Sequence, residues 1–231
     1  MANTKFSDLP AGAAIGGTEE IPAIQSSAGV TVTPAQISEY VARLMHPGYI
    51  AGRWYPALET VAGTGLAVAT NVIRMYPFRI YHPITITQLG VNVTTLSAGT
   101  NIGLAIYAHS TTTGNATGNP LASAAVSCAA TGAASATIAQ TSVTLQPGIY
   151  WMAFIGSSGA FNVAGSGAAQ SYLGAFLGGG TNPTTCCPSS SSANYRHEYS
   201  GTYGTWPDLT GGSPSIGNVN GNMAFAAFLA A

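Results

Sequence analysis

The sequence predicts an all-β protein built from many short strands, and three observations favour this class. Gly accounts for 29 of the 231 residues, and Ala, Ser and Thr are abundant, a mix typical of strands joined by turns. Several segments alternate apolar with small or polar residues, which is the period of a strand with one buried face. Turn sequences such as Pro147-Gly148 separate these segments.

The first 45 residues predict a separate segment of two strands and one helix. Residues 21–25 and 30–33 have the composition of two short strands around a turn. Thr33 is placed as a helix N-cap, with Pro34 at the first helical position and Gln36 completing a capping box. The apolar residues at helical spacing are Ile37, Val41 and Leu44. Because so small a unit cannot bury a core alone, we expect it to pack against a partner.

A larger β region, residues 46–231, begins at the helix-breaking sequence His46-Pro47-Gly48. In its first long strand the apolar positions change parity, and they are Ile84, Ile86, Leu89, Val91 and Val93. Because strand side chains alternate with a period of two, this change requires an extra residue. We therefore predict a β-bulge near Gln88-Leu89.

The pattern of apolar and polar residues predicts the remaining elements. Asn101–His109 alternates and predicts a half-buried strand. Ile149–Ile155 and Met223–Leu229 are apolar on both parities and predict central strands covered on both faces. Residues 178–194, rich in Gly, Ser, Thr and Pro, predict an exposed loop. Leu121–Ala139 is uncharged but lacks flanking Lys or Arg, so we interpret it as strand and loop rather than a membrane helix.

Charge is sparse and unevenly distributed. The 116 consecutive positions from Ile80 to Tyr195 contain no Asp, Glu, Lys or Arg, whereas charged residues usually make up about a quarter of a soluble domain. A neutral surface gives little repulsion between copies and few groups for acid–base chemistry. The net charge of −1 gives no electrostatic reason for binding nucleic acid or a membrane. We expect an assembling protein that is not an enzyme.

Neither a metal site nor a cofactor is expected. Cys128, Cys186 and Cys187 do not form a disulfide framework, and a bridge between adjacent cysteines would be strained, so reduced thiols are expected. A site formed by the adjacent cysteines with His197 is the alternative, but no C-x-x-C or H-x-x-H spacing supports it. The sequence also contains no P-loop and no nucleophile elbow.

Glycoside hydrolysis would need two carboxylates flanking the bond, about 5 to 9.5 Å apart. The β region has only three acids: Glu59, Glu198 and Asp208. A Glu198–Asp208 pair is geometrically possible, but isolated acids in turns or beside an arginine are more often surface or ion-pair residues. A glycan hydrolase is therefore a less favoured alternative than a protein that acts without catalysis.

Two stretches of the chain resemble virion proteins of tailed bacteriophages. The first resembles the N-terminal attachment module of tail fibres and related proteins, in FSDLP from Phe6, GTEEIPAIQ from Gly17 and VTVTPAQI from Val30. The second is similar to a β-sandwich module of phage fibres and spikes, in ITITQLGVNV from Ile84, GLAIY from Gly103, LQPGIYWMA from Leu145 and TYGTWPD from Thr202. The resemblance implies a homotrimeric structural protein of the virion. No long fibre shaft is visible, which leaves a capsid spike or decoration protein open.

Aromatic and polar side chains gather between Tyr195 and Trp206. Sugars bind on aromatic faces while polar neighbours fix their hydroxyls, so a glycan contact surface is one interpretation. The interpretation we favour is that the rings cover the sandwich edge or line a subunit interface. The candidate glycan-contact residues are Tyr195, Tyr199, Tyr203 and Trp206.

We therefore expect residues 1–45 to be a virion-attachment and trimerisation segment and residues 46–231 to be one jelly-roll-like antiparallel β-sandwich. The expected function is a fibre or spike component that attaches to host glycan; the alternative is a purely structural decoration or head-spike protein. Its partners would be its own copies, other virion proteins and host glycan. No signal peptide is visible, so assembly in the host cytoplasm is expected. The residues expected to mediate attachment and assembly are Phe6, Leu9, Ile21, Ile24, Ile37 and Val41.

Overall fold

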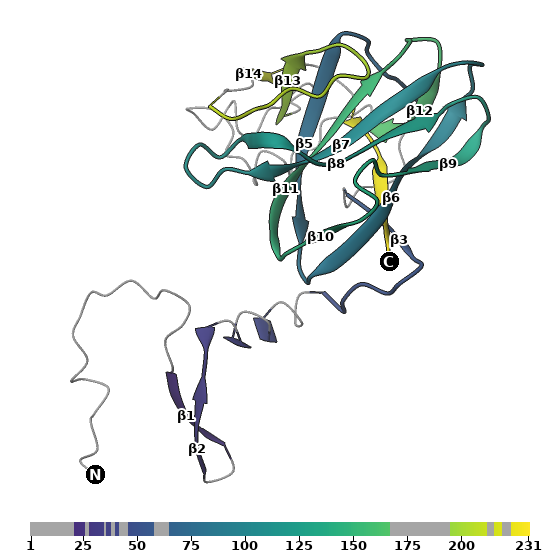
Figure 1. Ribbon diagram of the computed structural model, residues 1–231. Helices are drawn as coiled ribbons and strands as arrows, with labels where there is room; N and C mark the ends of the chain where they lie inside the picture. Colours follow the sequence, from purple (N-terminus) through teal and green to yellow (C-terminus); the bar gives the residue numbers. More distant parts are fainter. Residues whose placement is uncertain are drawn as a thin grey trace, which may run out of the picture. The chain divides into compact units, whose positions relative to one another are not determined.

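The computed structural model divides the chain into two compact units, Met1–Gly48 and Tyr49–Ala231 (Figure 1). The structure describes residues 21–25, 28–34, 36–37, 40–41, 46–57, 65–166, 195–211, 215–218 and 223–231. Within this part the fold is all-β, as the composition predicts, and every strand pairing is antiparallel. The predictions for Phe6, Leu9, the 178–194 loop, Cys186 and Cys187 lie outside the described residues.

The N-terminal unit contains one hairpin, in which β1 (Ile21–Gln25) pairs with β2 (Ala28–Val32). The capping box predicted after it is confirmed. The Thr33 amide donates to Gln36 Oε1 at 2.8 Å, and the Gln36 amide donates to Thr33 Oγ1 at 3.3 Å. The Ile37 amide then donates to the Thr33 carbonyl at 3.1 Å, the first bond of a helical turn. The described residues beyond it, Tyr40 and Val41, also have helical backbone, while Leu44 of the predicted stripe lies outside the described residues.

The C-terminal unit is a sandwich of two sheets. One has six strands in the order β14-β13-β5-β11-β7-β8. Their bounds are β14 (Ser215–Asn218), β13 (Tyr195–Ser200), β5 (Val72–Ile80), β11 (Gly148–Gly156), β7 (Asn101–His109) and β8 (Ala116–Ser127). The predicted strands over 101–109 and 149–155 are therefore confirmed.

The other sheet has eight strands arranged around β6. On one edge β6 pairs with β16 and then β12, and on the other with β10 and then β9. β3 pairs with β16, while β4 and β15 both pair with β12. The bounds are β3 (Trp54–Pro56), β4 (Gly65–Ala67), β6 (Ile84–Thr95), β9 (Gly132–Thr137), β10 (Val143–Leu145), β12 (Asn162–Ser166), β15 (Met223–Ala224) and β16 (Ala226–Ala230).

The main core lies between the two sheets. Alternate side chains of the central strands fill it, among them Phe78, Leu104, Ile106, Met152, Phe154, Ile86, Leu89 and Phe228. Burying each such side chain contributes roughly 2 kcal/mol. The two layers are also joined by a buried hydrogen bond, since the Ala226 amide of β16 donates to the Tyr76 hydroxyl of β5 at 3.3 Å.

The predicted bulge in the long strand is confirmed, one position before the predicted dipeptide. Leu229 of β16 pairs with Gln88, but the next residue, Ala230, pairs with Ile86, so Thr87 is the extra residue. The buried positions of β6 change parity across Thr87, which keeps Ile86 and Leu89 both in the core.

Two strand predictions need correction. Asn101–His109 is not half-buried, because Ala105 and Tyr107 on its outer face are fully buried under a second layer of side chains. Met223–Leu229 is not one strand covered on both faces. It divides into β15 and β16, and burial in β16 alternates because no second layer of described residues covers that strand on the outer face of its sheet. Leu121–Ala139 supplies β8 and β9, as interpreted; no helix of the described residues is long and apolar enough to cross a membrane.

Candidate ligand-binding groove on the six-stranded sheet

Residues 201–211 lie across the outer face of the six-stranded sheet and are fixed to it at three points. The Gly201 amide donates to the Asn71 carbonyl at 3.0 Å, and the Leu209 amide donates to the Gly118 carbonyl at 2.9 Å. Between them the buried Tyr107 hydroxyl of β7 donates to the Pro207 carbonyl at 3.0 Å. We call residues 201–211 the covering segment.

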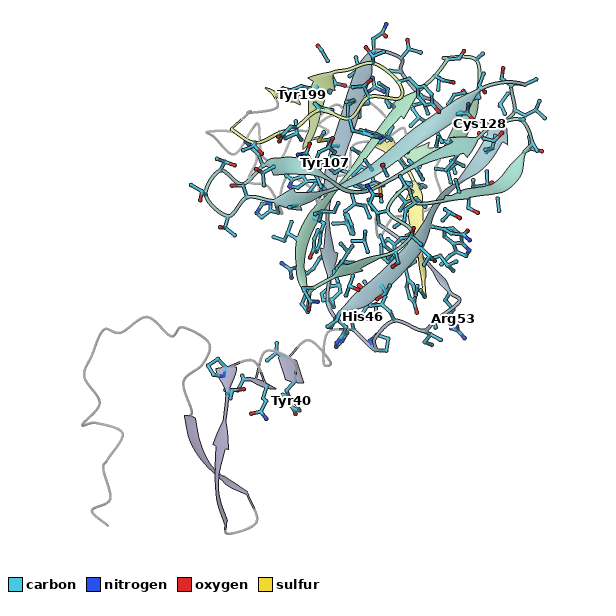
Figure 2. The ribbon with its side chains drawn as sticks, in the orientation of Figure 1. Tyr40, His46, Arg53, Tyr107, Cys128 and Tyr199 are labelled. Atoms are coloured by element: carbon cyan, nitrogen blue, oxygen red, sulfur yellow. The ribbon has the colours of Figure 1, made fainter. Side chains whose placement is uncertain are left out.

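A second apolar cluster lies beneath the covering segment. Its buried members, from β5, β7, β8, β11 and the segment itself, are Ile73, Met75, Ala105, Tyr107, Ala116, Trp151, Ala153, Ile155 and Leu209. Tyr199, Tyr203 and Trp206 pack on it and are partly buried. Figure 2 labels Tyr107 on β7 and Tyr199 on β13, both on this sheet. The central strands are thus covered on both faces.

A glycine makes room for the aromatic rings. A Cβ atom at Gly103 of β7 would lie 3.2 Å from Trp206 Cζ2 and 3.5 Å from Tyr203 Cε2. The Trp206 ring also makes an edge contact with Tyr107, at 6.4 Å between centroids. Because the rings lie directly on the strand, Gly103 and the rings form one packed unit, as when aromatics cover strand glycines elsewhere.

The rings form one wall of a groove with a volume of about 270 Å³. Strands β8 and β9 form the other wall. The two strands lie side by side there, because the Ala139 amide just after β9 donates to the Ser123 carbonyl of β8 at 2.8 Å. The lining residues are Gly103, Ser123, Ala124, Ala125, Thr137, Ala139, Tyr203, Gly204 and Trp206. We call this the Tyr203–Trp206 groove.

Of the four candidate residues, two line this groove and one does not. Tyr203 and Trp206 are in the lining, whereas Tyr199 packs on the cluster alone. The side chain of Tyr195 lies outside the described structure. All three described rings pack on the outer face of the six-stranded sheet, and both the subunit interface and glycan binding remain predictions. Ser123 and Thr137 were missed because short side chains in Ala-rich segments give no sequence signal.

Burial and nearby groups shift the titration of the phenols. Desolvation raises the pKa of Tyr203, and the proximity of Cys128 raises it further. Desolvation, with the nearby Asp208 carboxylate, also raises the pKa of Tyr107 well above its ordinary value. Both phenols therefore stay protonated and can donate hydrogen bonds at neutral pH.

The two acids weighed for hydrolysis have other partners. Glu198 accepts a hydrogen bond from Arg74 Nε at 3.0 Å, in a partly buried ion pair across β13 and β5. The Asp208 carboxylate accepts from the Thr210 amide at 2.8 Å and from Asn119 Nδ2 at 3.4 Å. The hydrogen bonds with Thr210 are the main cause that lowers the Asp208 pKa, so this carboxylate is ionised at neutral pH.

One polar contact near the cluster was not foreseen. The indole Nε1 of the buried Trp151 donates to His109 Nδ1 at 3.1 Å, and the two rings stack at 6.3 Å. Desolvation lowers the His109 pKa, which favours the neutral ring that can accept this bond.

Among the described residues no three His, Cys, Asp or Glu side chains gather as metal ligands. Cys128 is buried and free, and desolvation raises the pKa of its thiol.

A second groove, of about 300 Å³, lies on the outer face of the eight-stranded sheet. One wall of this groove is formed by the ring of Trp54, a residue that is 42% exposed and lies close to Gly90 of β6. The other lining residues are small or apolar apart from Asn92 and Ser135. The two outer faces thus share one arrangement, a tryptophan above a strand glycine.

Comparison with known proteins gives no match to a family model, to a curated protein or to a solved structure.

Proposed function

We propose that the chain is a homotrimeric structural protein of a tailed-bacteriophage virion, a fibre or spike component that presents its sandwich to host glycan. The observation that carries the proposal is the apolar stripe of the N-terminal unit. Ile37, Tyr40 and Val41 follow one another at helical spacing and are 43%, 65% and 47% exposed. A contiguous apolar stripe of this kind marks a protein–protein contact, and identical copies would cover it.

A jelly-roll-like chain path is proposed for the sandwich. Consecutive strands β5, β6 and β7 alternate between the two sheets, and β10, β11, β12 and β13 do the same. Such alternation supports a jelly-roll-like path, which is common among viral structural domains.

Glycan attachment is proposed to occur without chemistry at the Tyr203–Trp206 groove. The groove offers two aromatic rings and two hydroxyl side chains, Ser123 and Thr137, the kinds of group that hold a sugar. A small groove gives weak binding per copy. Linked copies in a trimer, and many trimers on a particle, raise the effective affinity by orders of magnitude.

The alternative is a decoration or head-spike protein that only stabilises the particle. The packing of Tyr203 and Trp206 on Gly103 favours it, because these rings have a structural role whether or not they bind a ligand.

Labelling of host cells distinguishes the two functions. The fluorescent full-length protein is incubated with the bacterium that the virion infects, and also with particles that lack the protein. A fibre or spike component labels the cells, and labelling falls when Trp206 is changed to Ala in a variant that still unfolds cooperatively. A protein that ignores cells but attaches to the deficient capsids would instead be a decoration protein.

A further inference from the structure

We propose that the Tyr203–Trp206 groove binds an uncharged saccharide, so that recognition involves aromatic stacking and hydroxyl hydrogen bonds without ion pairs. This inference rests on the proposed function and specifies the chemical class of its ligand. It follows from the groove's two aromatic rings, its two hydroxyls and the uncharged character of its described lining.

The rings are held in place before any ligand arrives. Trp206 and Tyr203 lie on Gly103, and Tyr107 holds the adjacent Pro207 carbonyl at 3.0 Å. Rigid rings lose little conformational entropy on binding, which favours stacking against the C–H face of a sugar. The volume of about 270 Å³ lies just below the usual range for small-molecule sites, so the groove suits only a short saccharide epitope.

Polar groups face the same groove from the opposite wall. Thr137 of β9 is exposed and Ser123 of β8 is partly exposed. Within the described part of the chain, neither hydroxyl makes a hydrogen bond, so both are available to a ligand. A hydroxyl both donates and accepts, which matches the hydroxyl groups of a sugar.

None of the described residues that line the groove carries a charge that would favour an acidic sugar. The structure describes the side chains of three arginines. Arg74 is paired with Glu198, Arg79 lies over the Tyr81 ring at 5.9 Å, and Arg53 is exposed and outside the lining. The charge nearest in sequence is the ionised Asp208, two residues beyond Trp206, and its sign repels anions. A uronate or sialate would lose hydration in the groove without gaining a counter-charge, which opposes its binding.

The test uses surface polysaccharide extracted from the host, both native and with its carboxyl groups chemically reduced to alcohols. Each preparation competes with host cells for the labelled full-length protein. An uncharged epitope predicts that both compete equally and that labelling changes by less than about twofold between 50 and 500 mM salt, because no ion pair is screened.

Competition that is lost on carboxyl reduction, or that falls steeply with salt, would overturn the inference and leave the proposed attachment function intact. Labelled cells with no competition from either preparation would show that the ligand is not a saccharide. Cells that are never labelled would refute the attachment function itself.

Two pairs of variants place the ligand in the groove. Thr137→Val removes one groove hydroxyl and should weaken competition roughly fivefold, the effect of about one hydrogen bond. Thr131→Val changes another exposed threonine, outside the lining, and should have no effect on competition. Ala125→Lys adds a cation to the lining and should create salt-sensitive binding to native acidic polysaccharide, whereas Ser127→Lys on the same strand should not. If Thr137→Val and Thr131→Val behave alike while both fold normally, the groove is not the site.

Discussion

At the scale of single residues, the contact between Trp151 and His109 makes the fold sensitive to pH. The indole is fully buried and donates to His109 Nδ1, so the histidine must be neutral at that nitrogen. Protonation at Nδ1 would remove the acceptor and break this hydrogen bond of the buried indole.

This contact predicts that stability falls on acidification through the histidine range. The folded pKa of His109 is below its ordinary value of 6.5, so the unfolded chain binds the proton more readily. The contribution is complete above about pH 6.5 and is lost as the pH falls toward the lower folded pKa. We expect a higher free energy of unfolding at pH 7.5 than at pH 5, measured with denaturant. We also expect a smaller difference in His109→Gln, whose amide oxygen can accept the indole bond at both values; an equal difference would show that His109 is not the group responsible.

Single positions differ in how far the sequence predicts them. The capping box at Thr33 and Gln36 was predictable, because its hydrogen bonds form within four residues. The partner of His109 was not, because Trp151 is 42 positions away and only strand pairing brings the two together. Gly103 also gave no signal, since a glycine on a strand shows a missing side chain but not the ring that occupies its place.

At the scale of elements, the covering segment explains why β7 differs from its prediction. The alternation of residues 101–109 gave the correct bounds, because inward-facing residues are set by the strand's own period. The burial of Ala105 and Tyr107 depends on residues about a hundred positions later, which no local pattern reports. Strand β9 was predicted only as part of the strand-and-loop stretch Leu121–Ala139, because its Gly, Ala, Ser and Thr residues produce no apolar period. Strand β10 was not predicted, because three residues are too few to establish a period.

The attachment of the covering segment can be weakened at one atom. Tyr107→Phe removes the hydroxyl that donates to Pro207 and should lower the free energy of unfolding by about 1 kcal/mol. Hydrogen exchange of the Leu209 amide, bound to Gly118, should become faster. Tyr150→Phe is the matched control: it also loses a tyrosine–carbonyl bond, to Gln146 at 2.9 Å, but should leave Leu209 exchange unchanged. Unchanged Leu209 exchange in Tyr107→Phe would mean that the other two attachment points suffice.

At the scale of the whole molecule, the features that suggest assembly lie in both units. The N-terminal unit exposes Ile37, Tyr40 and Val41, and the sandwich exposes Trp54. The charge-free stretch adds no repulsion between copies. The all-β class and the two packed sheets were predictable from composition and period. The strand order was not, because pairings such as β16 with β3 join segments from opposite ends of the sandwich's amino-acid sequence.

Assembly through the N-terminal stripe can be tested directly. We expect the full-length protein to sediment as a trimer and the double variant Ile37→Asp, Val41→Asp to sediment as a monomer, because two carboxylates would be buried without partners. Leu96→Asp is the control, since Leu96 is 48% exposed in the sandwich and is not part of the stripe. A wild-type protein that remains monomeric at micromolar concentration would contradict the trimer, and a double variant that remains trimeric would exclude the stripe as its contact.

The place of β16 also determines when the sandwich can be completed during translation. β16 is synthesised after every other strand of the described residues, yet it lies between β6 and β3 in the finished sheet. Until it leaves the ribosome, the nascent chain exposes one edge of β6, and β3 has no strand to join. Closure of that sheet therefore waits for β16, and until then chaperones that bind unpaired strand edges have access to β6.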